Sequence, residues 1–186
     1  MTRVLLAGLL GGIALFAWES VAHLALPLGQ VGVKPLPQEQ QVIASLKANI
    51  NEAGFYYFPA PTTPPATGTG FNGIMVVQPN GNMSLAPGQL ITQLVGDILA
   101  VLVAAVLLSW TSFPAFGTRV LFVTLMGLLP TLAVDVPYWN WYAFPASYTL
   151  SQFTVHLVGF AVAGLVLAKM IHLRTSAPVK QALKAA

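Results

Sequence analysis

The sequence has no cysteine and very little charge. Of its 186 residues only 7% are Asp, Glu, Lys or Arg, whereas 56% are hydrophobic; an average soluble domain is about 25% charged. The absence of cysteine excludes disulfide bonds, thiolate metal sites and cysteine nucleophiles. The shortage of charge excludes a soluble enzyme, a disordered tail and a nucleic-acid-binding module that works through a basic surface.

Long apolar runs make up most of the chain. A helix that crosses a bilayer needs about 20 mostly apolar residues, and such runs occupy residues 4–26, 89–110, 120–136 and 148–169. The third run contains Pro130, which a membrane helix tolerates when its neighbours satisfy the freed carbonyl. A signal peptide is the alternative for the first run, but no small-x-small cleavage site follows it. The sequence therefore predicts an all-α integral membrane protein, a bundle of four transmembrane helices.

The distribution of Lys and Arg predicts the orientation, because these residues concentrate in cytoplasmic segments. In a four-helix arrangement one side carries Arg3, Arg119, Lys169, Arg174, Lys180 and Lys184, and the other carries Lys34 and Lys47. We therefore expect both termini in the cytoplasm, with residues 1–26 as the first helix, 27–88 as an extracytoplasmic insert, 89–172 as the next three helices and 173–186 as a cytoplasmic tail.

The insert has its own pattern. Val42, Ile43, Leu46 and Ile50 repeat at the spacing of one helical face. Residues 55–58 and 73–78 are rich in aromatic and β-branched side chains, which is typical of strands. The Pro/Thr/Gly segment between them has no pattern that could pack. We expect a small α+β cap that rests on the outer ends of the helices.

A second outward segment, residues 137–148, reads PYWNWYAFPASY and is predicted to be a short loop. Its Trp and Tyr residues suit an aromatic belt at the membrane surface. Contact with a partner protein is the alternative role. The candidate interfacial or partner-binding residues are Tyr138, Trp139, Trp141 and Tyr142.

Five ionisable residues fall within the outer halves of the predicted helices. Glu19, Asp97 and His156 each lie seven or eight residues from the outward end of a helix, about 10–12 Å below the surface at 1.5 Å per residue. His23 follows Glu19 by one helical turn, and Asp135 lies near the outer end of the third helix. Charged groups inside membranes are costly, so these five are candidates for handling a ligand or protons.

Several chemistries suit this layer. Glu19, His23, Asp97 and His156 could ligate a divalent metal, and the two histidines could instead ligate a haem iron. The cluster could also relay protons, or bind a cationic or quinol headgroup. Mutual hydrogen bonding that locks the bundle without any ligand is the structural alternative. The spacing from Glu19 to His23 is not the Glu-x-x-His of di-iron proteins.

Motifs for other activities are missing. The sequence has no Gly-rich phosphate loop, HExxH or GxSxG. It also has no internal repeat of the kind found in many secondary transporters. Gly8 and Gly12 match the GxxxG spacing, which lets transmembrane helices approach closely.

Three phrases, LPQEQQVIASLKANINEAGFYYFP, RVLFVTLMGLLP and VPYWNWYAFPASYTL, resemble a group of uncharacterised small bacterial four-span membrane proteins. That group has an outward YFFP-like segment and a WNWYGFP-like loop, and Ala143 stands here where its pattern has glycine. The resemblance covers most of the chain after Leu36. It implies the architecture and brings no activity or ligand.

These observations favour a small accessory or binding protein of the bacterial inner membrane, non-catalytic, that contacts a partner through its insert and aromatic loop. The partner could be a larger membrane complex or a second copy of the chain. A haem- or metal-binding protein and a small proton-coupled transporter are the alternatives. The lack of ionisable residues in the inner halves of the predicted helices weighs against the transporter.

Overall fold

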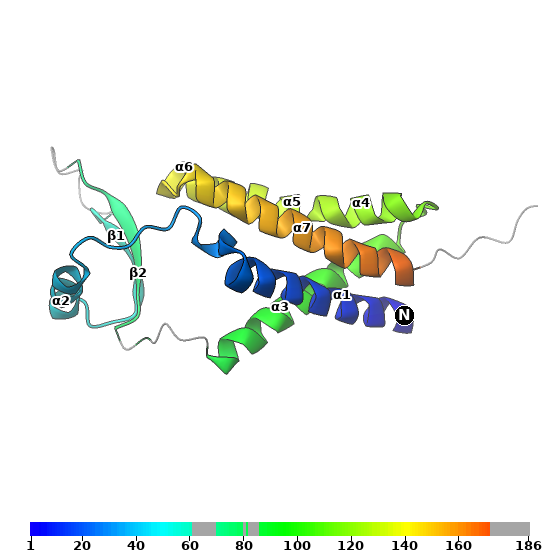
Figure 1. The fold of residues 1–186 in the computed structure, drawn as a ribbon, viewed down its shortest axis with the longest axis horizontal. Coiled ribbons are helices and arrows are strands. Elements are labelled where there is room, and N and C mark those ends of the chain that lie inside the picture. Colours follow the sequence, from blue (N-terminus) through cyan, green and yellow to red (C-terminus); the bar gives the residue numbers. More distant parts are fainter. Residues whose placement is uncertain (61–69, 80, 82–85, 172–186) are drawn as a thin grey trace, which may run out of the picture.

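The computed structural model describes residues 1–60, 70–79, 81 and 86–171. Within these, four helical stretches are long and apolar enough to cross a membrane: Thr2–Ala25, Pro87–Ser109, Phe116–Tyr142 and Ala146–Met170. They run roughly along the long axis of the molecule (Figure 1). The prediction of four candidate membrane-spanning helices is therefore confirmed. The predicted tail, with Arg174, Lys180 and Lys184, and most of the Pro/Thr/Gly segment lie outside the described residues.

The four stretches differ in regularity. The first is α1 (Thr2–Ser20) followed by the π-helical turn η1 (Val21–Ala25), and the second and fourth are single helices, α3 (Pro87–Ser109) and α7 (Ala146–Met170). The third consists of α4 (Phe116–Met126), α5 (Leu128–Pro130), the π-helical turn η3 (Thr131–Asp135) and α6 (Val136–Tyr142). The wider turn η3 directly follows Pro130, whose ring excludes the normal hydrogen bond there.

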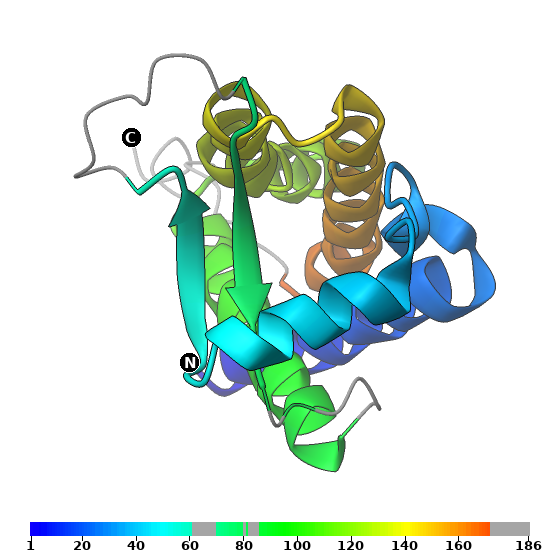
Figure 2. The ribbon, with the colours of Figure 1, turned by 90° about the vertical axis from the view of Figure 1, so that its left-hand side faces the viewer.

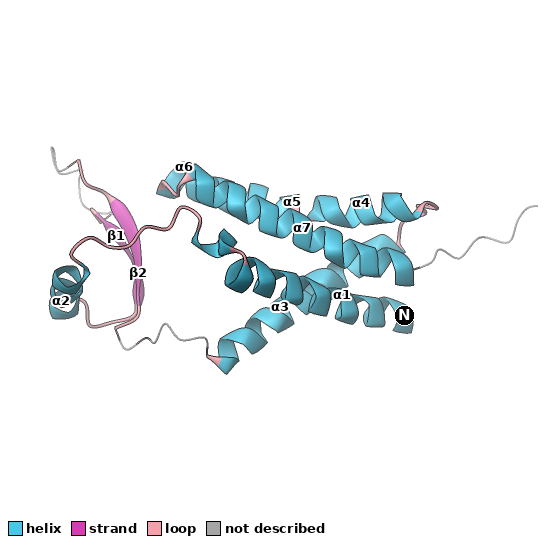
Figure 3. Cartoon of the chain, viewed as in Figure 1, coloured by secondary structure: helices cyan, strands magenta, loops and turns pink. Residues whose placement is uncertain are grey.

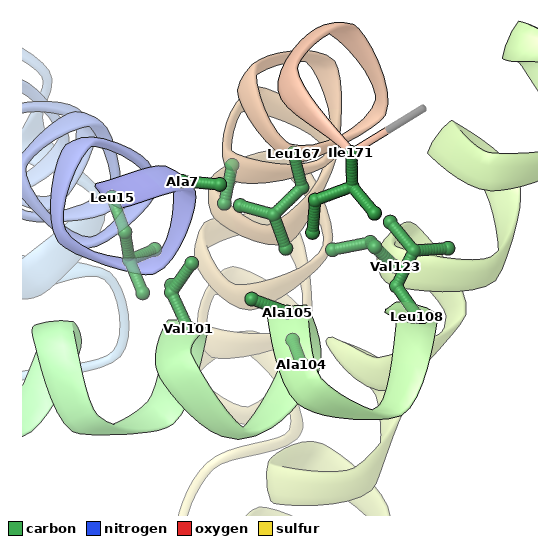
Figure 4. Close-up of a cluster of buried hydrophobic side chains, with 10 residues drawn as sticks. Ala7, Leu15, Val101, Ala104, Ala105, Leu108, Val123, Leu167 and Ile171 are labelled. Carbon is green, nitrogen blue, oxygen red and sulfur yellow. The ribbon is translucent and has the colours of Figure 1, made fainter. Parts of the chain in front are cut away.

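Helix α1 lies at the centre of the packing, with extensive contacts to both α3 and α7, while α4 packs chiefly on α7. The core between them is built from small and branched aliphatic side chains (Figure 4). Its buried members are Ala7, Leu15, Val101, Ala104, Ala105, Leu108, Val123, Ala163, Leu167 and Ile171. Alanine and valine at these contacts let the helix backbones approach, as in other membrane bundles.

Two glycines set the distance between α1 and α3. A Cβ at Gly12 would meet the backbone of Ile98, 2.9 Å from its nitrogen, and a Cβ at Gly8 would lie 3.0 Å from the Cα of Leu102. Only glycine leaves room for such an approach. The close approach predicted from the GxxxG spacing is thus confirmed.

Arg119, near the start of α4, is buried at 7% exposure rather than lying free at the surface. Its Nη1 donates hydrogen bonds to the carbonyl oxygens of Phe113 and Pro114, at 3.2 and 3.0 Å, and its Nη2 donates to that of Ala168 at 3.2 Å. The guanidinium thus satisfies a carbonyl in the last turn of α7 and fixes the loop before α4.

The aromatic segment differs from its prediction. Most of residues 137–148 is helical, because α6 continues the third stretch to Tyr142 and α7 begins at Ala146. Only residues 143–145 connect them. Ala143 ends α6 in the left-handed conformation, at φ 57°, where a non-glycine residue costs about 1 kcal/mol or more.

The insert has the predicted elements. Helix α2 (Glu39–Asn49) is followed by strands β1 (Gly54–Phe58) and β2 (Gly73–Val77), which pair antiparallel with Phe55 opposite Val76. The insert lies beyond one end of the bundle, and Met1 lies at the other (Figures 1 and 3). Seen from the insert end, the two strands lie side by side with α2 crossing near them (Figure 2). No residue of α2 is buried, so the insert has little core of its own.

Candidate functional site

A cleft opens among α1, α3 and α7 at the end of the bundle that carries the insert. At this end α3 diverges from the other helices (Figure 1), although Gln93 of α3 still reaches Glu19 of α1. The volume of the cleft is 390 Å³, within the range of about 300–1,000 Å³ that is typical of small-molecule sites. The lining residues are Phe16, Glu19, Ser20, His23, Leu24, Leu90, Gln93, Gln152, Val155 and His156.

Gln93 joins two acidic side chains on one wall of the cleft. Its Nε2 donates hydrogen bonds of 2.9 Å both to Oε2 of Glu19 and to Oδ1 of Asp97. Asp97 itself is 5% exposed, and its Oδ2 has no hydrogen-bond partner among the described residues. Both amide hydrogens of Gln93 are used in this way, so its Oε1 remains an acceptor for other groups.

The two histidines lie on different helices. His23 Nδ1 is 2.9 Å from the backbone carbonyl oxygen of Glu19, so this nitrogen carries the proton and Nε2 is left for other partners. His156 Nε2 lies 3.4 Å from Oδ2 of Asp135, within the range of an ion pair but longer than a well-formed hydrogen bond. Asp135 therefore contacts His156 but does not itself line the cleft.

The structure thus brings three of the five predicted residues, Glu19, His23 and His156, to one cleft. Asp97 and Asp135 are attached to it only through Gln93 and His156. The described residues contain no group of three or more His, Asp or Glu side chains placed to hold a metal ion. Metal binding by Glu19, His23, Asp97 and His156 gains no support from this arrangement and stays a prediction. Haem ligation by the two histidines stays a prediction.

Two residues that line the cleft were missed by the sequence analysis. Gln93 links the acids, and Gln152 lines the cleft at only 8% exposure while its amide makes no hydrogen bond to another described residue. A signal was available, because each glutamine precedes an ionisable residue by four positions, Gln93 before Asp97 and Gln152 before His156. Residues at that spacing share a helix face.

Trp18 directly precedes Glu19 on α1. In the structure its Nε1 donates a 2.9 Å hydrogen bond to the carbonyl oxygen of Val155, and its ring lies where a side chain at Gly159 would collide with it. Trp18 therefore joins α1 to α7 next to the cleft.

A second feature is the contact between the insert and α6. The rings of Phe55 and Tyr57 on β1 meet that of Tyr142 edge-on, with centroids 6.3 and 6.1 Å apart. Hydrogen bonding with Tyr142, followed by partial desolvation, raises the pKa of Tyr57 above its usual value. Tyr142 in turn packs on Tyr138 at 5.7 Å. The hairpin is thereby held against the end of the third stretch.

This contact encloses a shallow hollow of 750 Å³ that no charged residue lines. We call it the aromatic hollow; it is formed by Tyr57, Phe58, Pro59, Asn72, Gly73, Ile74, Trp141, Tyr142, Ala143, Phe144 and Pro145. Trp141 is 77% exposed, and the rings of Trp139 and Tyr138 are also exposed. The candidate partner-binding residues of the sequence thus lie on one helix beside the insert.

Four apolar helices that contain a layer of polar groups define the chain as a multi-pass helical membrane protein. Comparison with protein-family models, with curated proteins and with solved structures found no match to it. Its function is therefore inferred from its own geometry.

Proposed function

We propose that this protein is a small, non-catalytic binding protein of the bacterial inner membrane, and that it contacts a partner protein through the aromatic hollow. The observation that carries the proposal is the packing of Phe55 and Tyr57 on Tyr142. It joins two segments far apart in the sequence, the insert and α6, into one surface.

The composition of this surface supports a protein partner. Exposed Trp and Tyr with little side-chain entropy to lose are the residues that most often dominate binding energy at protein interfaces. The third stretch has 27 residues, about 40 Å of helix against a hydrocarbon core of about 30 Å. Its end at α6 therefore reaches the headgroup region, where a neighbouring membrane protein can meet it. Anchoring of the aromatic rings in the lipid interface is the competing role.

Photo-cross-linking in native membranes separates these two roles. A photoreactive phenylalanine in place of Trp141 should give a discrete protein adduct, whereas the same residue in place of Leu129, an exposed apolar position of the same stretch, should give lipid adducts alone. Adding Tyr142→Ala should lower the yield of the protein adduct about tenfold, the effect of about 1.4 kcal/mol of lost binding. Lipid adducts alone at position 141 would show that the rings only anchor the helix.

We further propose that the insert faces the outside and that both termini face the cytoplasm. The excess of Lys and Arg on the side of the termini supports this orientation. The fold supports one part of it, that the two termini share a side, because Met1 and the end of α7 lie at the same end of the bundle and the insert at the other (Figure 1).

The absence of cysteine makes this orientation directly testable. We expect Gln40→Cys, on α2, to react with a membrane-impermeant maleimide in intact spheroplasts. Ser112→Cys, in the loop between α3 and α4, should react only after the membrane is permeabilised. Both side chains are exposed, so access alone decides the labelling. The reverse pattern would place the insert in the cytoplasm.

A further inference from the structure

The cleft among α1, α3 and α7 is lined by a glutamine with hydrogen-bonding capacity to spare. Gln152 is more than nine-tenths buried, lines the cleft, and makes no side-chain hydrogen bond to another described residue. Its amide is therefore available to a molecule bound in the cleft. We propose that the cleft binds an amphiphile with a primary ammonium headgroup and an alkyl tail, for which Glu19 is the counter-ion. The proposal does not depend on the aromatic hollow.

The hydrogen-bonding groups of the cleft favour a donor headgroup. Both amide hydrogens of Gln93 are bound to carboxyl oxygens, so its Oε1 is an acceptor. Glu19 uses Oε2 for Gln93 and keeps Oε1, and Gln152 offers a free amide oxygen. A primary ammonium carries three N–H donors and no acceptor. It therefore matches three acceptors that come from three different helices.

The charges around the cleft favour a cation. Glu19 lines it, Asp97 lies behind Gln93 and Asp135 behind His156, while no Lys or Arg is among its lining residues. A carboxylate in a low-dielectric environment is stabilised by an opposite charge at close range. An anionic headgroup would be repelled by Glu19, and no Lys or Arg lines the cleft to offset that repulsion. The phosphate of a phospholipid is disfavoured for the same reason, even where its headgroup also carries an ammonium.

The remaining walls favour an alkyl tail. Phe16, Leu24, Leu90 and Val155 supply most of the other lining, and Leu24 is 70% exposed at the rim. The cleft lies between membrane-spanning helices, so its rim opens toward lipid. Its 390 Å³ is at the small end of ligand sites, which suits the headgroup and the first methylene groups, with the rest of the chain in the bilayer.

The test is equilibrium binding of radiolabelled dodecylamine to the full chain in phosphatidylcholine nanodiscs, with empty nanodiscs subtracted. We expect saturable binding of one dodecylamine per chain. Glu19→Gln and Gln152→Leu should each weaken it at least about tenfold, since each removes a hydrogen bond to a charged group. Glu39→Gln, which changes an acid on α2 outside the cleft, is the matched control and should bind like the wild type.

Three results would overturn the proposal: no saturable binding, equal competition by dodecanol, or wild-type affinity in Glu19→Gln. Competition by nanodiscs that contain phosphatidylethanolamine would also overturn it, because it would assign the site to a phospholipid headgroup. If Glu19→Gln does not fold, Leu24→Trp keeps every charge and fills the cleft. Loss of binding in Leu24→Trp supports the proposal, and unchanged binding contradicts it.

Discussion

Gly12→Leu should destabilise the bundle by about 3 kcal/mol, the upper end of the usual range for overpacking. A side chain at position 12 points at the backbone of Ile98, with Cβ only 2.9 Å from its nitrogen. Backbone atoms cannot rotate away as a side chain can, so α1 and α3 have to separate along their contact. Gly12→Ala makes the same collision with fewer atoms and should cost about 1 kcal/mol.

The measurement is the free energy of unfolding in mild detergent, with Gly96→Leu as the control. Gly96 lies within α3, and a Cβ there would have no neighbour within 4 Å. The Gly96→Leu variant should therefore leave the free energy of unfolding unchanged or raise it slightly, because leucine is a better helix former than glycine. Equal losses of stability in Gly12→Leu and Gly96→Leu would mean that the α1–α3 contact does not depend on glycine.

Arg119→Met should have an effect of similar size for a different reason. It keeps most of the side-chain volume but removes the guanidinium that binds the carbonyl oxygens of Phe113, Pro114 and Ala168. Hydrogen bonds that involve a charged group contribute about 1.5–3 kcal/mol each. Because the bonds share one side chain and are not additive, we expect a total loss of about 3 kcal/mol.

Two further variants show whether Arg119 stabilises the protein through the geometry of its guanidinium or only through its charge. Arg119→Lys keeps the charge but cannot reach separate carbonyls with a planar fork, so we expect it to recover only part of the stability. Arg3→Met removes a charge from the exposed start of α1 and should change the stability by less than about 0.5 kcal/mol. If Arg119→Lys behaves like the wild type, the charge alone matters.

Hydropathy predicted the number of long helices, but it did not predict where the third one ends. Residues 120–136 form the apolar run, and residues 137–148, rich in Trp and Tyr, were predicted to be a loop after it. The structure continues the helix through Tyr142, because aromatic residues can form helix where the chain reaches the membrane surface. The left-handed Ala143 then ends it. The sequence pattern therefore predicted the aromatic character of this segment but not its helical conformation.

For the candidate site, prediction from the sequence was limited in a different way. Counting residues along each helix predicts how deep Glu19, Asp97 and His156 lie, but it says nothing about how each helix is rotated. Rotation decides that Glu19 and His156 line the cleft and that Asp97 reaches it only through Gln93. The two glutamines were overlooked because amides carry no charge, although Gln93 joins α3 to α1 and Gln152 lines the cleft.

The packing order has a consequence for biosynthesis. The central helix α1 is made first, and α3, its glycine-mediated partner, is the next membrane helix to leave the ribosome. Helix α4 has few contacts with α3, and its main partner is α7, the last to be made. Membrane helices insert first and associate afterwards. The third stretch therefore waits in the bilayer without its partner until synthesis is nearly complete, which makes it the part of the nascent protein most open to capture by a chaperone or a protease.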